Sequence, residues 1–241
     1  MAALAERPSK FAGHRVMRGC FGLLLAVAMV LSPAAKADNW YFQGLVGKRF
    51  LTDADLTLGG TTSDMTIAVD AVPSGSAAVG YRFPAFPHRA LDMRVEIQGG
   101  AAESEPDTIT PRGALASRVG TTSKQGADAE NLHSIYAMTN LWFDYSLGHG
   151  WVVSAGGGIG ASYINWEDFG CCNMGAFLND SDIVFAYQAG AAIGYEIIKD
   201  LVIGLDYRYF ATADAEFNDN GNWSATYGAH DLMFAFRYYA F

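Results

Sequence analysis

The chain has 241 residues, 51% of them hydrophobic, so it is long enough and apolar enough to bury one sizeable core. That composition excludes an intrinsically disordered protein, and a mean hydropathy of only +0.10 argues against a bundle of membrane-spanning helices. The formal net charge of −9 argues against the basic surface that nucleic-acid binding requires.

The N-terminal segment has the organisation of a secretory signal peptide. Its apolar stretch, residues 21–35, is shorter than the roughly 20 residues of a spanning helix and is interrupted by a serine–proline pair. Basic residues precede this stretch, and Ala35 and Ala37 supply the small side chains that a signal peptidase reads. We therefore predict that residues 1–37 are cleaved after Ala37, which leaves Asp38 as the mature N-terminus.

Removal of this segment changes the charge and the cysteine content of the protein. The mature chain has 11 basic and 24 acidic residues, a net charge of −13, and keeps two adjacent cysteines, Cys171 and Cys172. Two cysteines are too few for a disulfide scaffold, so the pair either forms a vicinal disulfide or remains as thiols. Met17 is an alternative start that would give a signal peptide of more ordinary length.

The mature chain predicts β-strands, because apolar residues alternate with polar ones in stretches rich in aromatic and β-branched residues. Turn residues divide it into eight predicted strands, at residues 39–51, 74–83, 89–100, 132–147, 151–165, 183–198, 200–210 and 229–241. The long connections between them are residues 52–73, 101–131, 166–182 and 211–228. They alternate with short turns, which is the layout of an outer-membrane barrel with both termini on the periplasmic side. The predicted fold class is all-β, an eight-stranded antiparallel transmembrane β-barrel over residues 38–241.

Charged residues follow the same division into strands and connections. The four long connections hold 16 acidic residues and three basic ones, whereas the rest of the mature chain holds eight of each sign. The sequence therefore predicts a neutral barrel that carries acidic loops outside the membrane.

Alternation within the strands assigns their two faces. A charged side chain that faces hydrocarbon costs about 2–4 kcal/mol at mid-bilayer, so the polar face must point into the lumen. The predicted inward-facing charges are Arg82, Asp92, Arg94, Glu96, Asp144, Glu196, Asp206, Arg208 and Arg237. An eight-stranded barrel is only wide enough for its own side chains, so we expect these charges to pair with one another rather than to line an open pore. A water-soluble barrel is the alternative, but its interior would be apolar and its exterior polar.

Three short motifs are candidates for chemistry, and each departs from the pattern that its chemistry requires. The glycine run at residues 156–160 lacks the spacing and the following helix of a nucleotide loop. His133 and Ser134 are a candidate catalytic pair, yet adjacent strand residues face opposite sides and cannot easily share a proton. Residues 216–221 echo the start of a calcium loop, but Tyr227 occupies the position that needs a bidentate carboxylate. We therefore predict that the protein is not an enzyme and has no cofactor or metal site.

Three segments carry a resemblance to known barrels. The C-terminal residues 233–241, MFAFRYYAF, resemble the terminal strand signal of outer-membrane β-barrels, which alternates apolar residues and ends on phenylalanine. The predicted assembly signal consists of Phe234, Phe236, Tyr238 and Phe241. Residues 201–210, LVIGLDYRYF, look like the penultimate strand of the OmpA-like/opacity-protein barrel family, and residues 140–144, NLWFD, are similar to its mid-barrel strand.

This resemblance implies an envelope protein with a structural, adhesive or weakly pore-forming role. Its implied partners are outer-membrane lipid and lipopolysaccharide, the barrel-assembly machinery, and host or environmental ligands at the loops, with no nucleic acid. We expect a structural or surface-interaction role, with a narrow porin-like channel as the alternative and a lipid A-modifying enzyme as the third. The sequence departs from the family in one place. If Arg237 points inward, Phe241 does too, so either a bulge corrects the register or Tyr238 becomes the outward anchor.

The cleavage site gives a direct test. Protein extracted from the outer membrane should begin at Asp38 when its N-terminus is sequenced, because Ala35 and Ala37 fit the peptidase. Replacing Ala37 with leucine should block cleavage and leave residues 1–37 attached. A wild-type product that retains residues 21–36 in the inner membrane would contradict the prediction.

Overall fold

The computed structural model describes most of the chain after residue 38. The described residues are 39–52, 54–58, 63–69, 71–83, 90–104, 106–113, 116–117, 120, 122–123, 125–128, 131–171, 176–217 and 223–240. The predicted signal peptide with its cleavage site, Cys172 and Phe241 lie outside these residues. No helix among the described residues is long and apolar enough to cross a membrane.

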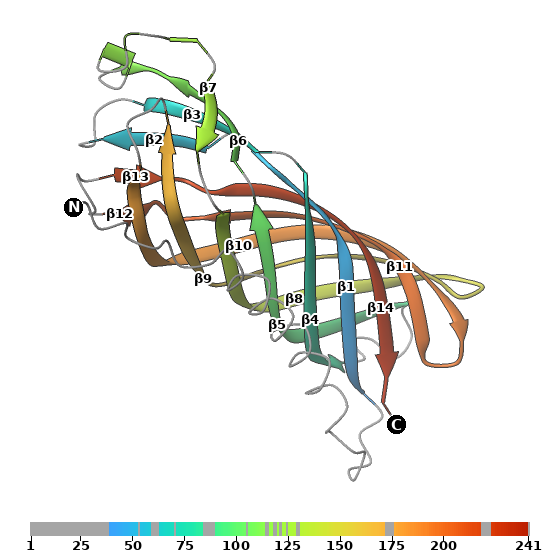
Figure 1. The fold of residues 1–241 in the computed structure, drawn as a ribbon. Helices are drawn as coiled ribbons and strands as arrows, with labels where there is room; N and C mark the ends of the chain where they lie inside the picture. The colour runs from blue at the N-terminus through green and yellow to red at the C-terminus, as the bar shows by residue number, and fades with distance from the viewer. Residues whose placement is uncertain are drawn as a thin grey trace, which may run out of the picture. The chain divides into compact units, whose positions relative to one another are not determined.

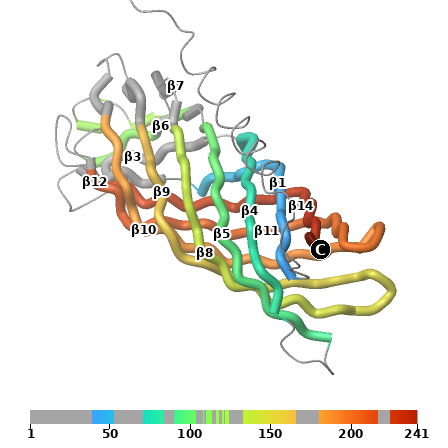
Figure 2. The backbone as a smooth tube through the Cα atoms, turned by 90° about the horizontal axis from the view of Figure 1, so that it is seen from below, coloured from blue at the N-terminus to red at the C-terminus, as the bar shows by residue number. Residues whose placement is uncertain are grey.

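Eight long strands form a closed antiparallel barrel (Figures 1 and 2). They are β1 (Trp40–Leu51), β4 (Val72–Phe83), β5 (Leu91–Ser104), β8 (Asn131–Gly148), β9 (Trp151–Cys171), β10 (Ala176–Ile198), β11 (Leu201–Thr212) and β14 (Gly228–Tyr239). Each strand pairs with its neighbour along the chain, and β1 pairs with β14 to close the ring. The all-β, eight-stranded antiparallel barrel that the sequence predicts is therefore confirmed.

Short strands within the long connections extend the barrel sheet beyond one rim of the barrel. They are β2 (Ala54–Leu58), β3 (Ser63–Val69), β6 (Pro106–Pro111), β7 (Gln125–Asp128), β12 (Ala215–Phe217) and β13 (Trp223–Ala225). We call them the collar sheet, which starts on β9 and runs through β7, β6, β3, β2 and β13 to β12. In Figure 1 the collar sheet lies at the end of the barrel away from the arrowhead of β14. The backbone N–H of Glu216 then donates to Asp182 Oδ2 at 2.9 Å, which ties β12 to β10.

The collar sheet corrects the sequence prediction, which assigned these connections to loops. Its strands are only three to seven residues long, and proline stands at both ends of β6, so each segment shows too little alternation to predict a strand. Some partners lie in the same connection, as in the pairs β2–β3, β6–β7 and β12–β13. Others come from different connections: β2 pairs with β13, and β3 pairs with β6. Pairing within and between connections therefore creates strands that no single segment predicts.

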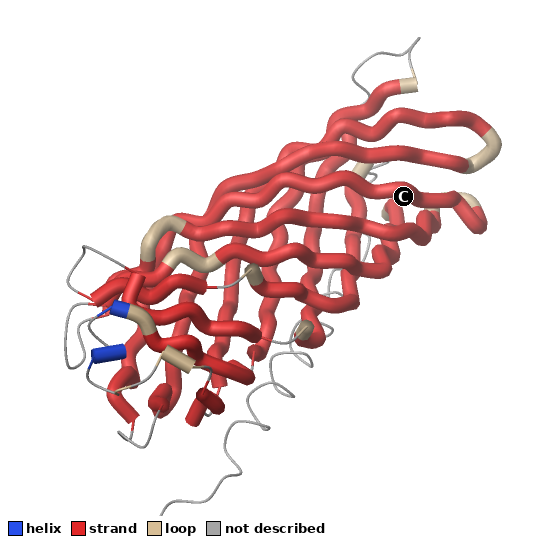
Figure 3. The backbone as a smooth tube through the Cα atoms, turned by 90° about the horizontal axis from the view of Figure 1, so that it is seen from above, coloured by secondary structure: helices blue, strands red, loops and turns tan. Residues whose placement is uncertain are grey.

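The opposite rim has tight turns. Strand β8 turns into β9 through Gly148, His149 and Gly150, all with positive φ, and β10 turns into β11 through Asp200 at φ 68°. The backbone N–H of Tyr239 donates to the Asp200 carbonyl at 2.8 Å, so β14 ends at this same rim. Figure 3 shows the strands running between the two rims. Short turns at one rim and long connections at the other match the predicted layout.

Side chains alternate between the lumen and the outer wall. In β14, Asp231 and Arg237 are buried, whereas Phe234, Phe236 and Tyr238 are exposed. Tyr238 thus points outward, in agreement with the alternative in which this residue, rather than Phe241, is the outward anchor of the last strand. Strand β1 turns Tyr41 and Gln43 inward.

Glycines in β9 make space for large lumen side chains. A Cβ atom on Gly158 would lie 1.9 Å from Asn140 Oδ1, and one on Gly156 would lie 2.7 Å from the Trp142 ring. The glycine run at residues 156–160 therefore serves packing in a strand, in agreement with its poor match to a nucleotide loop.

Barrel closure depends on the last strand, which pairs with both β1 and β11. Removing residues 238–241 should impair assembly, because the Tyr239–Tyr41 and Tyr238–Leu201 pairings are lost and a strand edge is left open. Tyr238→Phe keeps the outward aromatic ring and should assemble normally. Membrane yield and the mobility shift between unheated and heated gel samples measure folding; an unchanged shift in the truncated protein would contradict the expectation.

Candidate functional site

Buried polar side chains meet in the middle of the lumen. We call this set the lumen plug. Its charged members are Arg94, Glu96, Asp144, Asp206, Arg208 and Arg237, and its uncharged members are Tyr41, Gln43, Gln98, Asn140, Trp142 and Gln188. Three arginines face three carboxylates, so the plug has no net formal charge. These side chains face the lumen because alternate residues of a strand point to the same side, and the pairing register places them at similar positions along the barrel axis.

Asp144 joins two of the arginines. Arg94 on β5 binds both oxygens of this β8 carboxylate, with Nε–Oδ2 at 2.5 Å and Nη2–Oδ1 at 3.0 Å. Arg237 on β14 approaches from across the lumen, with Nη1 3.6 Å from Asp144 Oδ2, and its Nε donates to Gln43 Oε1 at 2.8 Å. The two-pronged contact of Arg94 fixes both partners, since the guanidinium and carboxylate planes match.

Glu96 is the most fully coordinated carboxylate of the plug. Its Oε2 accepts a hydrogen bond from the Tyr41 hydroxyl at 2.7 Å. Its Oε1 accepts from the Trp142 indole at 2.9 Å and the Asn140 amide at 3.0 Å. Arg94 Nη1 lies 3.5 Å from Oε2, so charge and hydrogen bonds together compensate the loss of water around this buried anion.

Arg208 completes the plug from β11. Its Nε and Nη2 bind the two oxygens of Asp206 at 2.8 and 3.0 Å, and its Nη1 donates to Gln98. Its guanidinium stacks over Trp142, 4.8 Å from the ring centroid, which adds a cation–π contact. Nη1 also lies 3.9 Å from Glu96 Oε1, so the contacts of Arg208 reach both neighbouring carboxylates.

The structure brings together six of the nine charges that the sequence predicts to face inward. The other three lie near the tight-turn rim. Arg82 is half-buried, with its guanidinium 4.5 Å from the centroid of the Tyr239 ring, and Asp92 is also half-buried. Glu196 is exposed and accepts a hydrogen bond from the Asp200 backbone at 3.1 Å. The pairing register shifts just after Glu196, so this residue belongs to the turn rather than to the lumen.

Sequence reasoning missed a further buried ion pair, which lies outside the lumen plug and joins Arg49 to Asp231. Arg49 Nε and Nη2 bind the two Asp231 oxygens at 2.7 Å each, and the guanidinium lies 4.9 Å from the Phe210 ring centroid. The parity of β14 could have found Asp231, which lies six residues before Arg237 and so shares its face. Arg49 gave no such signal, because glycines interrupt the alternation of β1.

Among the described residues, His133 and Ser134 do not form a catalytic pair, and residues 218–221 of the calcium-like segment lie outside the described part of the chain. Ser134 is buried, with its Oγ 3.4 Å from Ser162 Oγ, whereas His133 belongs to the opposite face of β8. Cys171 ends β9, but Cys172 lies outside the described residues, and so does the proposed vicinal disulfide.

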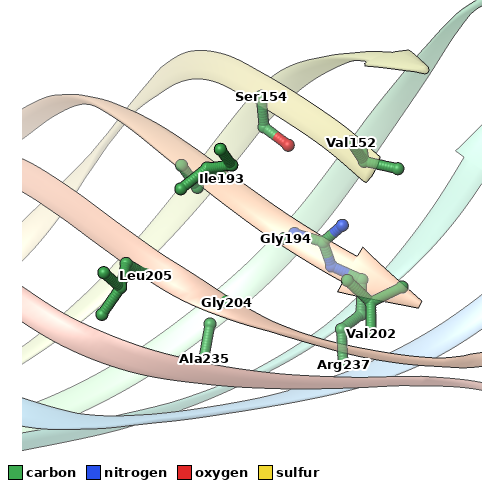
Figure 4. Close-up of a pocket in the computed structure, with 10 residues that line it drawn as sticks. Val152, Ser154, Ile193, Gly194, Val202, Gly204, Leu205, Ala235 and Arg237 are labelled. Carbon is green, nitrogen blue, oxygen red and sulfur yellow. The ribbon is translucent and has the colours of Figure 1, made fainter. Parts of the chain in front are cut away.

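A small cavity lies between the plug and the tight-turn rim (Figure 4). Arg237 and Ser154 border it, together with Gly194, Gly204 and Ala235. Its volume of about 10 Å³ for a water-sized sphere is close to the minimum that holds one water molecule. Small residues on β10, β11 and β14 account for this space, because they leave the lumen wall without side-chain bulk.

No protein-family model and no curated protein match the sequence. Among solved structures, the chain is similar to the outer membrane protein OprG from Pseudomonas aeruginosa. The TM-score is 0.54 and the identity 12%, over 85% of this chain and 98% of that one. It is also similar to the outer membrane protease OmpT from Escherichia coli (TM-score 0.45, 6% identity, 86% and 99% coverage). A third similar structure is Neisserial surface protein A (TM-score 0.44, 13% identity, 83% and 97% coverage).

The likeness to OprG shows a shared fold. With its closed eight-stranded ring, apolar wall and charged lumen, the chain has the fold of the small outer-membrane β-barrels. This is the architecture of the OmpA-like and opacity-type proteins that the sequence resembles, and the resemblance in fold is therefore confirmed.

The plug predicts a large stability difference between two arginine variants. Arg208→Ala should lower the free energy of unfolding by about 3–5 kcal/mol, because Asp206 loses its buried partner. Arg112→Ala removes an arginine side chain from an exposed position in a long connection, and it should change the free energy of unfolding by less than about 0.5 kcal/mol. Urea titration of the folded fraction in detergent measures both.

A double variant separates pairing from simple loss of packing. Asp206→Leu combined with Arg208→Met replaces the pair with apolar side chains and should recover most of the stability that Arg208→Ala loses. A wild-type unfolding midpoint for Arg208→Ala would show that the lumen is hydrated rather than plugged.

Proposed function

We propose that the protein is an exported outer-membrane barrel with a structural or surface-interaction role, whose lumen is closed. Cleavage of residues 1–37 would deliver it to the periplasm, and the barrel-assembly machinery would insert it. The exposed apolar residues of its outer wall, such as Ile97, Ile183 and Phe234, support a lipid environment, because water-soluble barrels carry polar residues there.

The lumen plug is the observation that carries the closed-barrel proposal. Every one of its charges has an ionic partner, and the most central carboxylate, Glu96, accepts three further hydrogen bonds from neutral donors. An ion or solute that crosses the barrel would have to separate pairs such as Arg208–Asp206. Separating a buried pair leaves a charge uncompensated, at a cost of about 3–5 kcal/mol. At that cost the separated state would be populated less than about 1% of the time, so the barrel would not conduct steadily.

The long connections support a role at the cell surface. They hold most of the acidic residues of the mature chain, and the collar sheet organises them into paired strands beyond the rim. Envelope lipid, lipopolysaccharide and host or environmental ligands are the partners that such a surface would meet. We propose a non-catalytic role, supported by the separation of His133 and Ser134 onto opposite faces of β8.

One observation favours a narrow channel as the second candidate. The cavity beside Arg237 lies in the lumen wall between this arginine and the tight-turn rim, where Gly194, Gly204 and Ala235 leave space. Movement of Arg237 away from Asp144 would extend that space toward the plug. This contact is already long, since Arg237 Nη1 lies 3.6 Å from Asp144 Oδ2.

Planar-bilayer recording of the refolded protein distinguishes the two candidates. The wild-type protein should be silent, because its lumen is filled. Arg208→Ala should produce small, noisy openings, since a shorter neutral side chain leaves room for water, and Arg112→Ala should be as silent as wild type. Stable openings of one defined size in the wild-type protein would overturn the closed-barrel proposal in favour of the channel.

A further inference from the structure

The outer wall of the barrel carries an unusual cation. Among the lysines and arginines in the described barrel strands, Arg49, Arg82, Arg94, Arg208 and Arg237 turn toward the lumen, and Lys48 alone points outward. Its cross-strand neighbours on β14 and β4 are Leu232 and Pro73, neither of which can neutralise it. A cation on the lipid face is costly at mid-membrane and is tolerated near the headgroups.

The position of Lys48 agrees with a headgroup level. It lies three residues before the end of β1, at the rim that carries the long connections. Strand register aligns Lys48 with Leu232 and Tyr207, and the next outward row aligns Phe50 with His230 and Tyr209. Tyrosine side chains gather at membrane interfaces because the ring is apolar and the hydroxyl needs a polar partner.

Two of these neighbours form a polar unit on the wall. The Tyr207 hydroxyl and His230 Nδ1 are 2.8 Å apart, and their rings stack with centroids 6.0 Å apart. If the tyrosine donates this bond, the imidazole proton resides on Nε2, which then offers a second N–H donor. His230 is the diagonal cross-strand neighbour of Lys48, a spacing that a long side chain can bridge.

We propose that Lys48, His230 and Tyr207 bind a phosphate group of lipid A, the phosphorylated glycolipid anchor of lipopolysaccharide. The ammonium and the imidazole N–H supply donors to the anion, and Tyr207 holds the imidazole in place. Two residues closer to the tight-turn rim, Val46 and Phe234 form an exposed apolar pair in register with each other, on which acyl chains can pack. The inference rests on the proposed outer-membrane orientation, which places the long connections and this rim in the outer leaflet.

Native mass spectrometry of the full-length mature barrel, with diphosphoryl lipid A added in non-ionic detergent, tests the site. Lys48→Ala should weaken binding at least about tenfold, the change expected when a charge-assisted hydrogen bond is lost. Lys48→Arg keeps the charge and should bind nearly as wild type does. Lys199→Ala removes an exposed lysine from the turn at the opposite rim and should also leave binding unchanged.

Tyr207→Phe tests the histidine separately. It removes the hydroxyl that orients His230 but no charge, so binding should fall by a smaller factor than in Lys48→Ala. The gel mobility shift on heating verifies that each variant is folded, and Lys48→Gln replaces Lys48→Ala if the alanine variant fails to fold.

Three results would overturn the proposal: unchanged lipid A binding by Lys48→Ala, equal binding of dephosphorylated lipid A, or equal competition by phosphatidylglycerol. The last would identify a general anionic-lipid surface instead. Bilayer recording without lipid A tests the closed lumen independently, so a conducting wild-type protein would reject the closed-barrel role and leave the lipid site standing.

Discussion

The whole structure follows from one constraint: a charge on the barrel wall is costly where that wall faces the middle of the hydrocarbon layer, and a ring of eight strands has little room inside. Polar strand residues must point inward, where their side chains fill the lumen of an eight-stranded barrel. A buried charge in that space is tolerated only with a partner. The pairs of Arg94 with Asp144 and of Arg208 with Asp206 are therefore the arrangement that the strand pattern requires.

The strands and most of the plug could be predicted from the sequence, because a strand of 12 or more residues repeats its alternation several times. Strand β5 alternates polar and apolar residues from Leu91 to Gln98, and in β11 the charges Asp206 and Arg208 alternate with apolar and aromatic residues, which gave the facing of Arg94 and Arg208. Which charges pair is a different matter. Asp144 meets Arg237 through the curvature of the closed barrel, and a linear pattern holds no information on contacts across a lumen.

The failures have equally physical causes. The collar strands are too short to show a period, and their hydrogen bonds come from partners both within one connection, as in β2–β3, and in different connections, as in β3–β6. The inward orientation of Arg49 was not predicted, because Gly44 and Gly47 interrupt the alternation of polar and apolar residues in β1. Glu196 lies on the lumen-facing side of β10, as alternation predicts, but it lies at the end of the strand. Alternation predicts the face of a residue and not its position along the barrel axis, so it could not show that Glu196 is exposed at the rim.

The seam where β1 meets β14 is the junction that closes the ring, and two of its side-chain contacts join directly paired residues. Arg49 stands opposite Asp231, and Gln43 stands opposite Arg237, across 182 and 194 positions of the chain. A slip of β14 by one residue would turn Asp231 and Arg237 toward lipid, since strand faces alternate. These two contacts therefore favour the correct register between the first and last strands, because a shift by one residue would break both of them.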